Sequence, residues 1–360
     1  MAEVPETQTG QVFLVQNAST RYQGSKQKIL DWIWKHISNL EFETFLDAMG
    51  GTGCVGFLAK KHGKQVFYND ILRANYYIGL ALIENDSTRL SKSDVEFLLS
   101  NHSDLKYESF VYDTFRKIYY LDEENAWLDM VIANIKELTD AYKRAVALAA
   151  LFQACIIKRP YNLFHRANLY MRTSDVDRSF GNKVTWDTPF EKHFQNFVTE
   201  YNSCVFSNSK SNKALNMDVL QIPDEESYDL VYIDPPYFSE VRGELDYHYF
   251  YHFLEGLCMY LEKGSQAWRE QIDFSRKPKP LKKMKSPWTN KKTIKDAFDN
   301  VLRKFGHSIL VVSYNSRGIP SEQEIVAMLR KYKSHVTVER IGYQYALSRT
   351  HPDELLFIAE

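Results

Sequence analysis

The sequence predicts an α/β protein whose sheet is interrupted by a helical insertion. Strand-like apolar runs and a glycine-rich turn occupy the first 72 residues, and further strand-like runs return after residue 200. Between them, residues 73–200 show long helical stretches and no clear strand. Strands that alternate with helices indicate parallel pairing in one sheet. We therefore predict one domain of about seven strands from residues 1–72 and 201–360, with a helical lobe from residues 73–200 inserted into it.

The first elements are predicted between residues 26 and 70. Apolar residues recur at helical spacing after Ser25, a candidate N-cap, which predicts an amphipathic helix over residues 26–38. Two apolar runs, at residues 42–47 and 65–70, flank a glycine turn and the start of a helix. This order is typical of a βαβ unit.

The later strands are expected at five apolar runs. They lie at residues 203–208, 229–234, 308–315, 334–343 and 354–359. The link between the last two runs is too short for the crossover that a parallel pair needs. We therefore expect these two strands to form an antiparallel hairpin at the edge of the sheet.

Composition narrows the class of protein. No apolar run in the 360 residues has the length of a membrane span, and the first residues lack a basic segment followed by an apolar one. We therefore expect a cytoplasmic protein without membrane contact. The four cysteines form no CxxC pair, which predicts neither a disulfide framework nor a metal site. The formal net charge of −1 means that contact with nucleic acid would need a local basic patch.

A glycine-rich turn follows the first predicted strand. The stretch FLDAMGGTGCVGF, residues 45–57, has the strand–turn–helix order that brings backbone close to a nucleotide-like ligand. Asp70 ends the next strand, at about the interval where an acid binds ribose hydroxyls. Asp47 precedes the glycines, and its carboxylate would repel a pyrophosphate but attract a sulfonium group. The pattern favours S-adenosylmethionine over NAD; the alternative is a turn that only packs a helix on a strand.

The stretch VYIDPPYFSE, residues 231–240, places an acid and two prolines directly after an apolar run. Pro235 and Pro236 cannot donate hydrogen bonds within a sheet, so the strand should stop at Asp234. Each proline fixes its own φ and restricts the preceding residue, which predicts a stiff corner from Asp234 to Tyr237. An ordinary turn and a functional corner are both open on these residues alone.

Four motifs in this order resemble the Dam-like class of S-adenosylmethionine-dependent DNA adenine-N6 methyltransferases. They are RYQGSK (21–26), LDAMGGTG (46–53), YND (68–70) and IDPPY (233–237). The resemblance implies a Rossmann-like methyltransferase sheet, a site-specific enzyme acting on double-stranded DNA, and no metal. The insertion between Asp70 and Asp234 corresponds to the helical target-recognition region of that family. Met49 departs from the pattern, because the family usually has phenylalanine there.

The resemblance also implies roles for individual residues. Asp234, Pro235 and Tyr237 are the implied catalytic residues. The implied cofactor contacts are Tyr22, Lys26, Asp47, Gly51, Gly53, Asp70, Asp218 and Asp234. The adenine amine is a poor nucleophile, and acceptors at Asp234 and a proline carbonyl would aim its lone pair at the methyl carbon. Tyr237 would stack on a base flipped out of the duplex.

Two basic segments are candidate DNA contacts. Residues 274–292 contain eight Lys or Arg and no acid. In residues 156–183, basic residues alternate with aromatic ones. The residues expected to contact phosphates or base edges are Lys282, Lys283, Lys285, Arg159, Arg166 and Arg172. The alternatives are a solvated loop for the first segment and a structural role in the lobe for the second.

Other functions share these features. An RNA or protein-amide methyltransferase would use the same cofactor-binding half of the fold, and a non-catalytic DNA-binding regulator could keep it. Asp234 and Tyr237 favour the enzyme. His248 and His252 lie at helical spacing without evident oxygen or sulfur partners, so no metal site is predicted there. The sequence leaves open the recognised bases, the oligomeric state and a restriction-modification system with a separately encoded restriction endonuclease.

Overall fold

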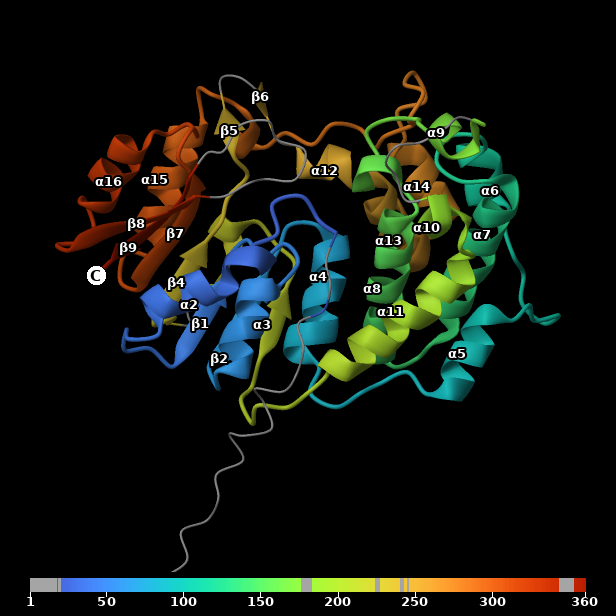
Figure 1. The fold of residues 1–360 in the computed structure, drawn as a ribbon, viewed down its shortest axis with the longest axis horizontal. Coiled ribbons are helices and arrows are strands. Elements are labelled where there is room, and N and C mark those ends of the chain that lie inside the picture. Colours follow the sequence, from blue (N-terminus) through green and yellow to red (C-terminus); the bar gives the residue numbers. More distant parts are fainter. Residues whose placement is uncertain are drawn as a thin grey trace, which may run out of the picture.

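The computed structural model describes residues 18, 21–175, 183–223, 227–239, 243–244, 246–342 and 353–360. A seven-stranded sheet lies at the left of Figure 1 and a body of helices at the right. None of the helices among the described residues is both long and apolar enough to cross a membrane.

The sheet has the strand order β3-β2-β1-β4-β7-β9-β8. Its strands are β1 (Thr44–Asp47), β2 (Gln65–Asn69), β3 (Lys213–Leu215), β4 (Leu230–Ile233), β7 (Ile309–Asn315), β8 (Val336–Gly342) and β9 (Asp353–Ala359). The pairs from β3 to β7 are parallel, whereas β9 is antiparallel to both β7 and β8. The Rossmann-like sheet of about seven strands and the antiparallel pair at its edge are confirmed. A separate short pair is formed by β5 (Phe238–Ser239) and β6 (Gly243–Glu244).

Helices surround the sheet and form the adjoining body. Those near the sheet are η1 (Gln27–Ile29), α2 (Leu30–Ile37), α3 (Cys54–Lys61), α4 (Arg73–Gly79), η2 (Leu80–Glu84), η4 (Val219–Gln221), η5 (Pro287–Thr289), α15 (Ile294–Lys304) and α16 (Glu322–Leu329). Those of the body are α5 (Lys92–Leu99), α6 (Phe110–Phe115), α7 (Asp122–Glu137), α8 (Ala141–Ile157), η3 (Pro160–Asn162), α9 (Tyr170–Thr173), α10 (Lys183–Asp187), α11 (Phe190–Cys204), α12 (Tyr247–Phe250), α13 (His252–Lys263) and α14 (Ser265–Gln271).

The first helix begins one turn later than its sequence pattern suggests. Its first turn is the 3₁₀ segment η1, with Lys26 at the N-cap position. The hydroxyl of Ser25 accepts a hydrogen bond of 3.4 Å from the backbone N–H of Gln27 instead. Lys26 is therefore placed at a tight turn, where its side chain is buried.

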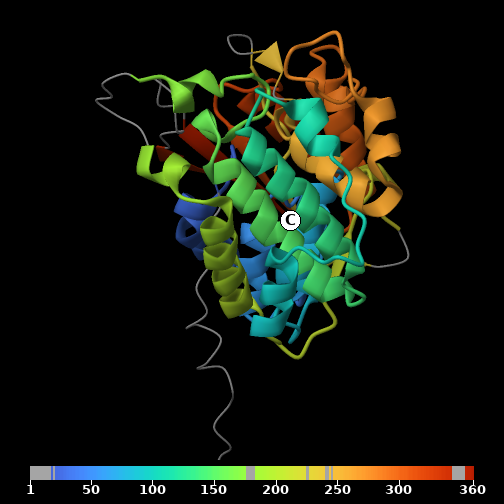
Figure 2. The same cartoon turned by 90° about the vertical axis from the view of Figure 1, so that its right-hand side faces the viewer.

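The two faces of the sheet have different cores. One core joins Leu46, Val231 and Leu310 to the apolar sides of α15 and α16. The other joins Phe45 and Tyr232 to the helical body in one continuous cluster. Alternate strand residues point to opposite faces, which explains the division. Figure 2 shows the helical body from its outer side.

The helical body extends beyond the predicted lobe of residues 73–200. Helix α13 packs against α4, α7 and α14, although it follows the proline corner in the sequence. The reason is its apolar side, on which Phe253 contacts the rings of Phe115 and Trp268.

The strand predicted at residues 203–208 is wrong. Helix α11 continues to Cys204, and no strand is assigned until β3 begins at Lys213. The intervening linker is held by amide side chains, because Asn208 Nδ2 donates to the carbonyls of Lys60 (3.1 Å) and Lys64 (2.8 Å). Asn212 Oδ1 then accepts from the backbone N–H of Val66 at 2.9 Å, which aligns β3 with β2.

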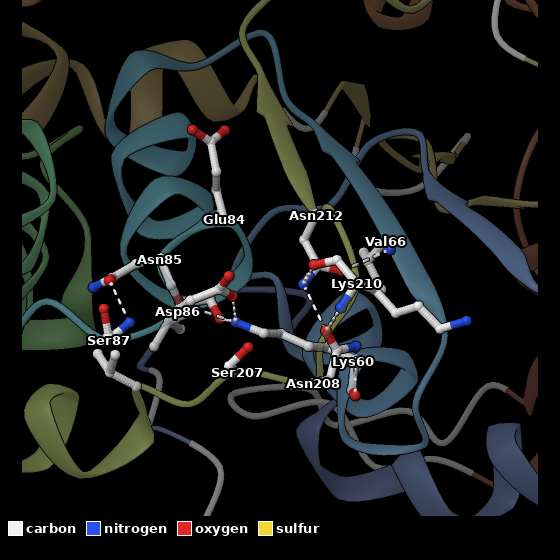
Figure 3. A network of polar contacts seen from close by, with 12 residues as sticks. Lys60, Val66, Glu84, Asn85, Asp86, Ser87, Ser207, Asn208, Lys210 and Asn212 are labelled. Carbon is white, nitrogen blue, oxygen red and sulfur yellow. Dashed lines mark hydrogen bonds and ion pairs between the residues drawn. The ribbon is translucent and has the colours of Figure 1, made fainter.

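Figure 3 shows the polar network around this linker. The fully buried ammonium of Lys60 donates to the carbonyl of Asn85 at 2.9 Å and lies 3.8 Å from Asp86. Burial lowers the pKa of Lys60 to about 8. Its donors are used to join α3 to the end of η2, so we assign it a structural role.

Candidate active site

One pocket lies where the carboxyl ends of neighbouring parallel strands meet. Asp47 ends β1, while Asp70, Asp218 and Asp234 follow β2, β3 and β4, and all four line the pocket. In open α/β sheets this edge is the usual ligand site. Of the other residues predicted for cofactor or catalysis, Tyr22, Lys26, Gly51, Pro235 and Tyr237 also line it. Gly53 lies beside the pocket as the N-cap of α3.

The glycine turn closely approaches the next strand. A Cβ atom on Gly50 would lie 2.1 Å from the ring of Tyr68, so this contact requires glycine. Gly51 and Gly53 have φ values of 55° and 71°, in the left-handed region that glycine adopts readily. The Tyr68 hydroxyl donates to the carbonyl of Gly51 at 2.7 Å, which fixes the turn.

Asp70 is built into the same turn. Its Oδ2 accepts from the backbone N–H of Gly51 at 2.8 Å, and its Oδ1 accepts from that of Leu72 at 2.8 Å. Burial raises the pKa of Asp70 to about 6, against the lowering effect of these hydrogen bonds. Each carboxylate oxygen can accept a second hydrogen bond, so a ribose contact is compatible with this geometry.

Asp47 lies under the glycine turn and is buried. Its Oδ2 accepts from the backbone N–H of Gly56 at 2.9 Å. Burial, with a smaller contribution from the charges of Asp234 and Asp70, raises the pKa of Asp47 to about 7, against the lowering effect of the Gly56 N–H. Asp47 and Asp70, both with raised pKa values, therefore line the pocket. A cationic ligand would favour their ionised forms.

The proline corner carries a compact ionic network. Lys26 Nζ lies 2.6 Å from Asp234 Oδ2 and 2.7 Å from the Tyr237 hydroxyl. The Tyr237 hydroxyl lies 3.0 Å from Asp234 Oδ1 and 2.6 Å from Glu354 Oε1. Burial raises the pKa of Asp234 to about 6, while Lys26 acts to lower it and Glu354 to raise it. Lys26, predicted as a cofactor contact, therefore binds Asp234 and Tyr237 of the proline corner.

Aromatic rings form another wall of the pocket. Tyr22 stacks on Tyr251, with ring centroids 4.1 Å apart, and lies nearly parallel to Tyr247 at 5.7 Å. Asn75 Nδ2 donates to the Tyr22 hydroxyl at 3.1 Å. Tyr247 and Asn75 were not predicted as site residues. They lie in helices α4 and α12, which are far apart in the sequence. Of the residues in this wall, the family resemblance had implied a cofactor contact for Tyr22.

The basic segment of residues 274–292 contains exposed lysines and a buried tryptophan. Lys282, Lys283 and Lys285 are exposed. Of these three, Lys285 also lines the pocket. Trp288 is buried against Phe298, with ring centroids 5.2 Å apart, so it anchors the segment rather than facing solvent.

Two of the three arginines predicted to contact DNA have structural surroundings. Arg159 is buried, and its guanidinium donates to Asn168 and to the carbonyl of Tyr119. Arg172 binds Glu124 with two hydrogen bonds of 2.8 and 2.7 Å. Both side chains are therefore occupied by contacts within the helical body. Of the three arginines, Arg166 is the exposed one.

The histidines near the corner have separate surroundings. His252 is buried, with its Nε2 at 2.8 Å from the Tyr119 hydroxyl, and burial lowers its pKa to about 3. His248 lines the pocket. Among the residues that the structure describes, no group of three or more His, Cys, Asp or Glu side chains could hold a metal ion.

The family model and the relatives that match this chain all point to DNA methyltransferases. A family model described as D12 class N6 adenine-specific DNA methyltransferase matches residues 22–256. Type II methyltransferase M2.HphI of Haemophilus parahaemolyticus is 30% identical over 94% of this chain and 96% of its own length. Type II methyltransferase M.NlaIII of Neisseria lactamica is 23% identical over 91% of this chain and 93% of its own length. Modification methylase StsI of Streptococcus sanguinis is 25% identical over 90% of this chain, which spans 48% of that protein.

Proposed function

Since the chain belongs to the D12 class of N6 adenine-specific DNA methyltransferases, we propose that it transfers the methyl group of S-adenosylmethionine to an adenine flipped out of duplex DNA. One observation carries the proposal. The carboxylate of the proline corner and the acids of the glycine turn line a single pocket. The corner would bind the target base and the turn would bind the methyl donor, so the reacting atoms would meet between them.

The pocket suits the charge of S-adenosylmethionine. Its sulfonium supplies an electrophilic methyl carbon, and the ionised forms of Asp47, Asp70 and Asp234 would attract the positive charge. Asp47 and the Gly51 turn would hold the methionine part. Asp70 would accept hydrogen bonds from the ribose of the cofactor, while Asp218 would lie near the adenine ring of the cofactor.

The corner would activate the amine without a strong base. The Asp234 carboxylate and a proline carbonyl would accept its two protons, which directs the nitrogen lone pair at the methyl carbon. As the new nitrogen–carbon bond forms, the bond between the methyl carbon and the sulfur would break, and S-adenosylhomocysteine would leave with a neutral sulfur. The amine would then be cationic and would give one proton to Asp234. The ring of Tyr237 would hold the flipped base by stacking. Its position is fixed by Tyr314, whose ring lies edge-on with centroids 5.0 Å apart.

The rest of the surface would bind the duplex. We propose that Lys282 and Lys283 contact backbone phosphates, that Lys285 binds near the pocket entrance, and that Arg166 contributes from the helical body. The body would read the recognition sequence. The names "Type II methyltransferase" and "modification methylase" of the relatives support a place in a restriction-modification system, with a restriction endonuclease as a separate protein.

A transfer assay with labelled S-adenosylmethionine tests this function. Duplex DNA should be labelled, whereas RNA and protein should not, and sequencing of methylated adenines from expressing cells should reveal one short motif. Asp234→Ala should nearly abolish the single-turnover rate while leaving folding and most DNA affinity unchanged. Labelling of RNA or protein alone would overturn the DNA assignment. An equal rate in Asp234→Ala would remove the corner from catalysis.

A further inference from the structure

Glu354 lies beside the proline corner and is fully buried. It is the second residue of β9, and because β9 is antiparallel to β7, its start lies at the edge where the parallel strands end. We infer that Glu354 is a positioning residue, which keeps the Asp234 carboxylate available to the target amine by binding Lys26 and Tyr237. This inference rests on the proposed function and adds a residue to the same site.

The contacts of Glu354 are those of a hydrogen-bond acceptor. Its Oε1 accepts hydrogen bonds from the Tyr237 hydroxyl at 2.6 Å and from the Ser313 hydroxyl at 2.7 Å. The same oxygen lies 3.4 Å from Lys26 Nζ. Three donors thus converge on one oxygen. A buried carboxylate needs such donors to stay charged, since burial alone disfavours the ion.

The two donors shared with Asp234 give this arrangement its consequence. The Tyr237 hydroxyl has one proton, and it lies closer to Glu354 (2.6 Å) than to Asp234 (3.0 Å). When the hydroxyl donates its hydrogen bond to Glu354, Asp234 Oδ1 keeps its full capacity to accept a hydrogen bond from the amine of the target base. Without Glu354, the hydroxyl would turn to Asp234 and compete with the substrate.

Charge gives a second, concordant reason. Lys26 lies between the carboxylates of Asp234 and Glu354, at 2.6 and 3.4 Å. In their ionised forms, these three groups together carry one negative charge. Without Glu354, Lys26 would neutralise Asp234, although positive charge develops on the amine during methyl transfer. Glu354 therefore supplies the charge that balances Lys26, and Asp234 remains negative toward the base.

The pH dependence of the reaction reports this coupling. Burial raises the pKa of Asp234, Lys26 acts to lower it and Glu354 to raise it. The titratable groups that act on Asp234 come from several elements: Lys26, Asp47, Tyr232, Tyr237, Tyr247 and Glu354. Burial raises the pKa values of Tyr232 and Tyr247 above their usual value, so both stay neutral near pH 7. Removing the charge of Glu354 should thus move the pKa of Asp234 downward.

The decisive variant is Glu354→Gln, measured by single-turnover methylation of a duplex carrying the mapped site between pH 5 and 9. We expect the plateau rate to fall about 10- to 100-fold, as for other misplaced catalytic groups, and the midpoint of the acid limb to shift to lower pH. Glu255→Gln is the matched control. Glu255 is also buried, but it accepts from the backbone N–H groups of Arg73 and Ala74. Its variant should keep the wild-type midpoint.

A second variant, Glu354→Asp, keeps the inference testable if Glu354→Gln fails to fold. Glu354→Asp keeps the charge but shortens the reach to Tyr237, so its midpoint should stay near that of the wild type while its plateau falls. An unchanged plateau in either variant, or an unchanged midpoint in a folded Glu354→Gln protein, would overturn the inference. If the wild-type protein methylated no duplex adenine, the proposed function itself would fail.

Discussion

At the scale of residues, the pocket gathers acids that the sequence marks and acids that it does not. Asp47, Asp70 and Asp234 each end or follow an apolar run, so their position at the strand ends could be predicted. Glu354 could have been found only by asking which residues an antiparallel last strand brings to that edge. Arg159 was misjudged because an arginine that pairs with backbone carbonyls inside a body has the same sequence context as one that binds phosphate.

The first residue-scale prediction concerns Asp70. Asp70→Ala should weaken S-adenosylmethionine binding by about 1 to 3 kcal/mol, because charge-assisted hydrogen bonds to the ribose are lost. Titration calorimetry measures the affinity. Asp70→Asn is the control, since its amide oxygen can still accept a hydrogen bond from Gly51 and preserve part of the turn. Equal affinity of Asp70→Ala and the wild type would show that the ribose binds elsewhere.

The second concerns the two parts of the Tyr237 side chain. Tyr237→Phe keeps the stacking ring but removes the hydroxyl that joins Lys26, Asp234 and Glu354, so it should slow single-turnover methylation while base flipping persists. Tyr237→Ala should in addition destabilise the flipped state by about 1 to 3 kcal/mol. Fluorescence of 2-aminopurine at the target position follows flipping. A Phe variant that methylates at the wild-type rate would assign no role to the hydroxyl.

At the scale of elements, strand ends and loops differ in how far sequence predicts them. The runs that became β1, β2, β4, β7, β8 and β9 are long enough to show a buried strand. β3 has only three residues, Lys213–Leu215, and its alignment depends on amide side chains of the preceding linker. Apolar residues near the end of α11 therefore produced a false strand at 203–208. The packing of α12–α14 into the helical body depends on contacts distant in sequence, which periodicity does not reveal.

The element-scale prediction separates the lysines of the basic segment. Replacing Lys282 and Lys283 by alanine should weaken binding to all duplexes alike and reduce the slope of log affinity against log salt by about 0.9 per lost phosphate contact. Lys285→Ala should also slow single-turnover methylation, since Lys285 lines the pocket. Lys92→Ala on α5, an exposed lysine paired with Glu96, is the control and should change neither. Altered sequence preference with an unchanged salt slope would contradict phosphate contact.

At the scale of the whole molecule, the helical body and one face of the sheet share a continuous core. The cluster runs from Phe45 and Tyr232 of the sheet to Phe253 and Trp268 of the body. Because no polar layer divides this cluster, the two parts should unfold together. The free energy of global unfolding should therefore respond to a change of charge in the pocket. This coupling links the stability of the protein to the ligand that the pocket attracts.

Asp47→Asn tests that link. Burial raises the pKa of Asp47 to about 7 in the folded protein, above its value of about 4 in an unfolded chain. Between these values the folded state binds more protons, so the contribution of Asp47 to stability falls as pH rises from about 4 to 7. Relative to the wild type, Asp47→Asn should gain about 1 to 3 kcal/mol of stability between pH 5 and pH 8. Denaturant unfolding at several pH values measures this gain.

The same variant should bind S-adenosylmethionine less well, and increasingly so as pH rises, because the wild-type carboxylate ionises and attracts the sulfonium whereas the amide does not. Addition of the cofactor should accordingly raise the melting temperature of the wild type more at pH 8 than at pH 6, with a smaller pH dependence in Asp47→Asn. Asp31, an exposed acid on α2, provides the control through Asp31→Asn, for which neither difference should appear. If the cofactor raised the melting temperature of the wild type and of Asp47→Asn by the same amount at every pH, the buried carboxylate of Asp47 would not bind the positive charge of the methyl donor.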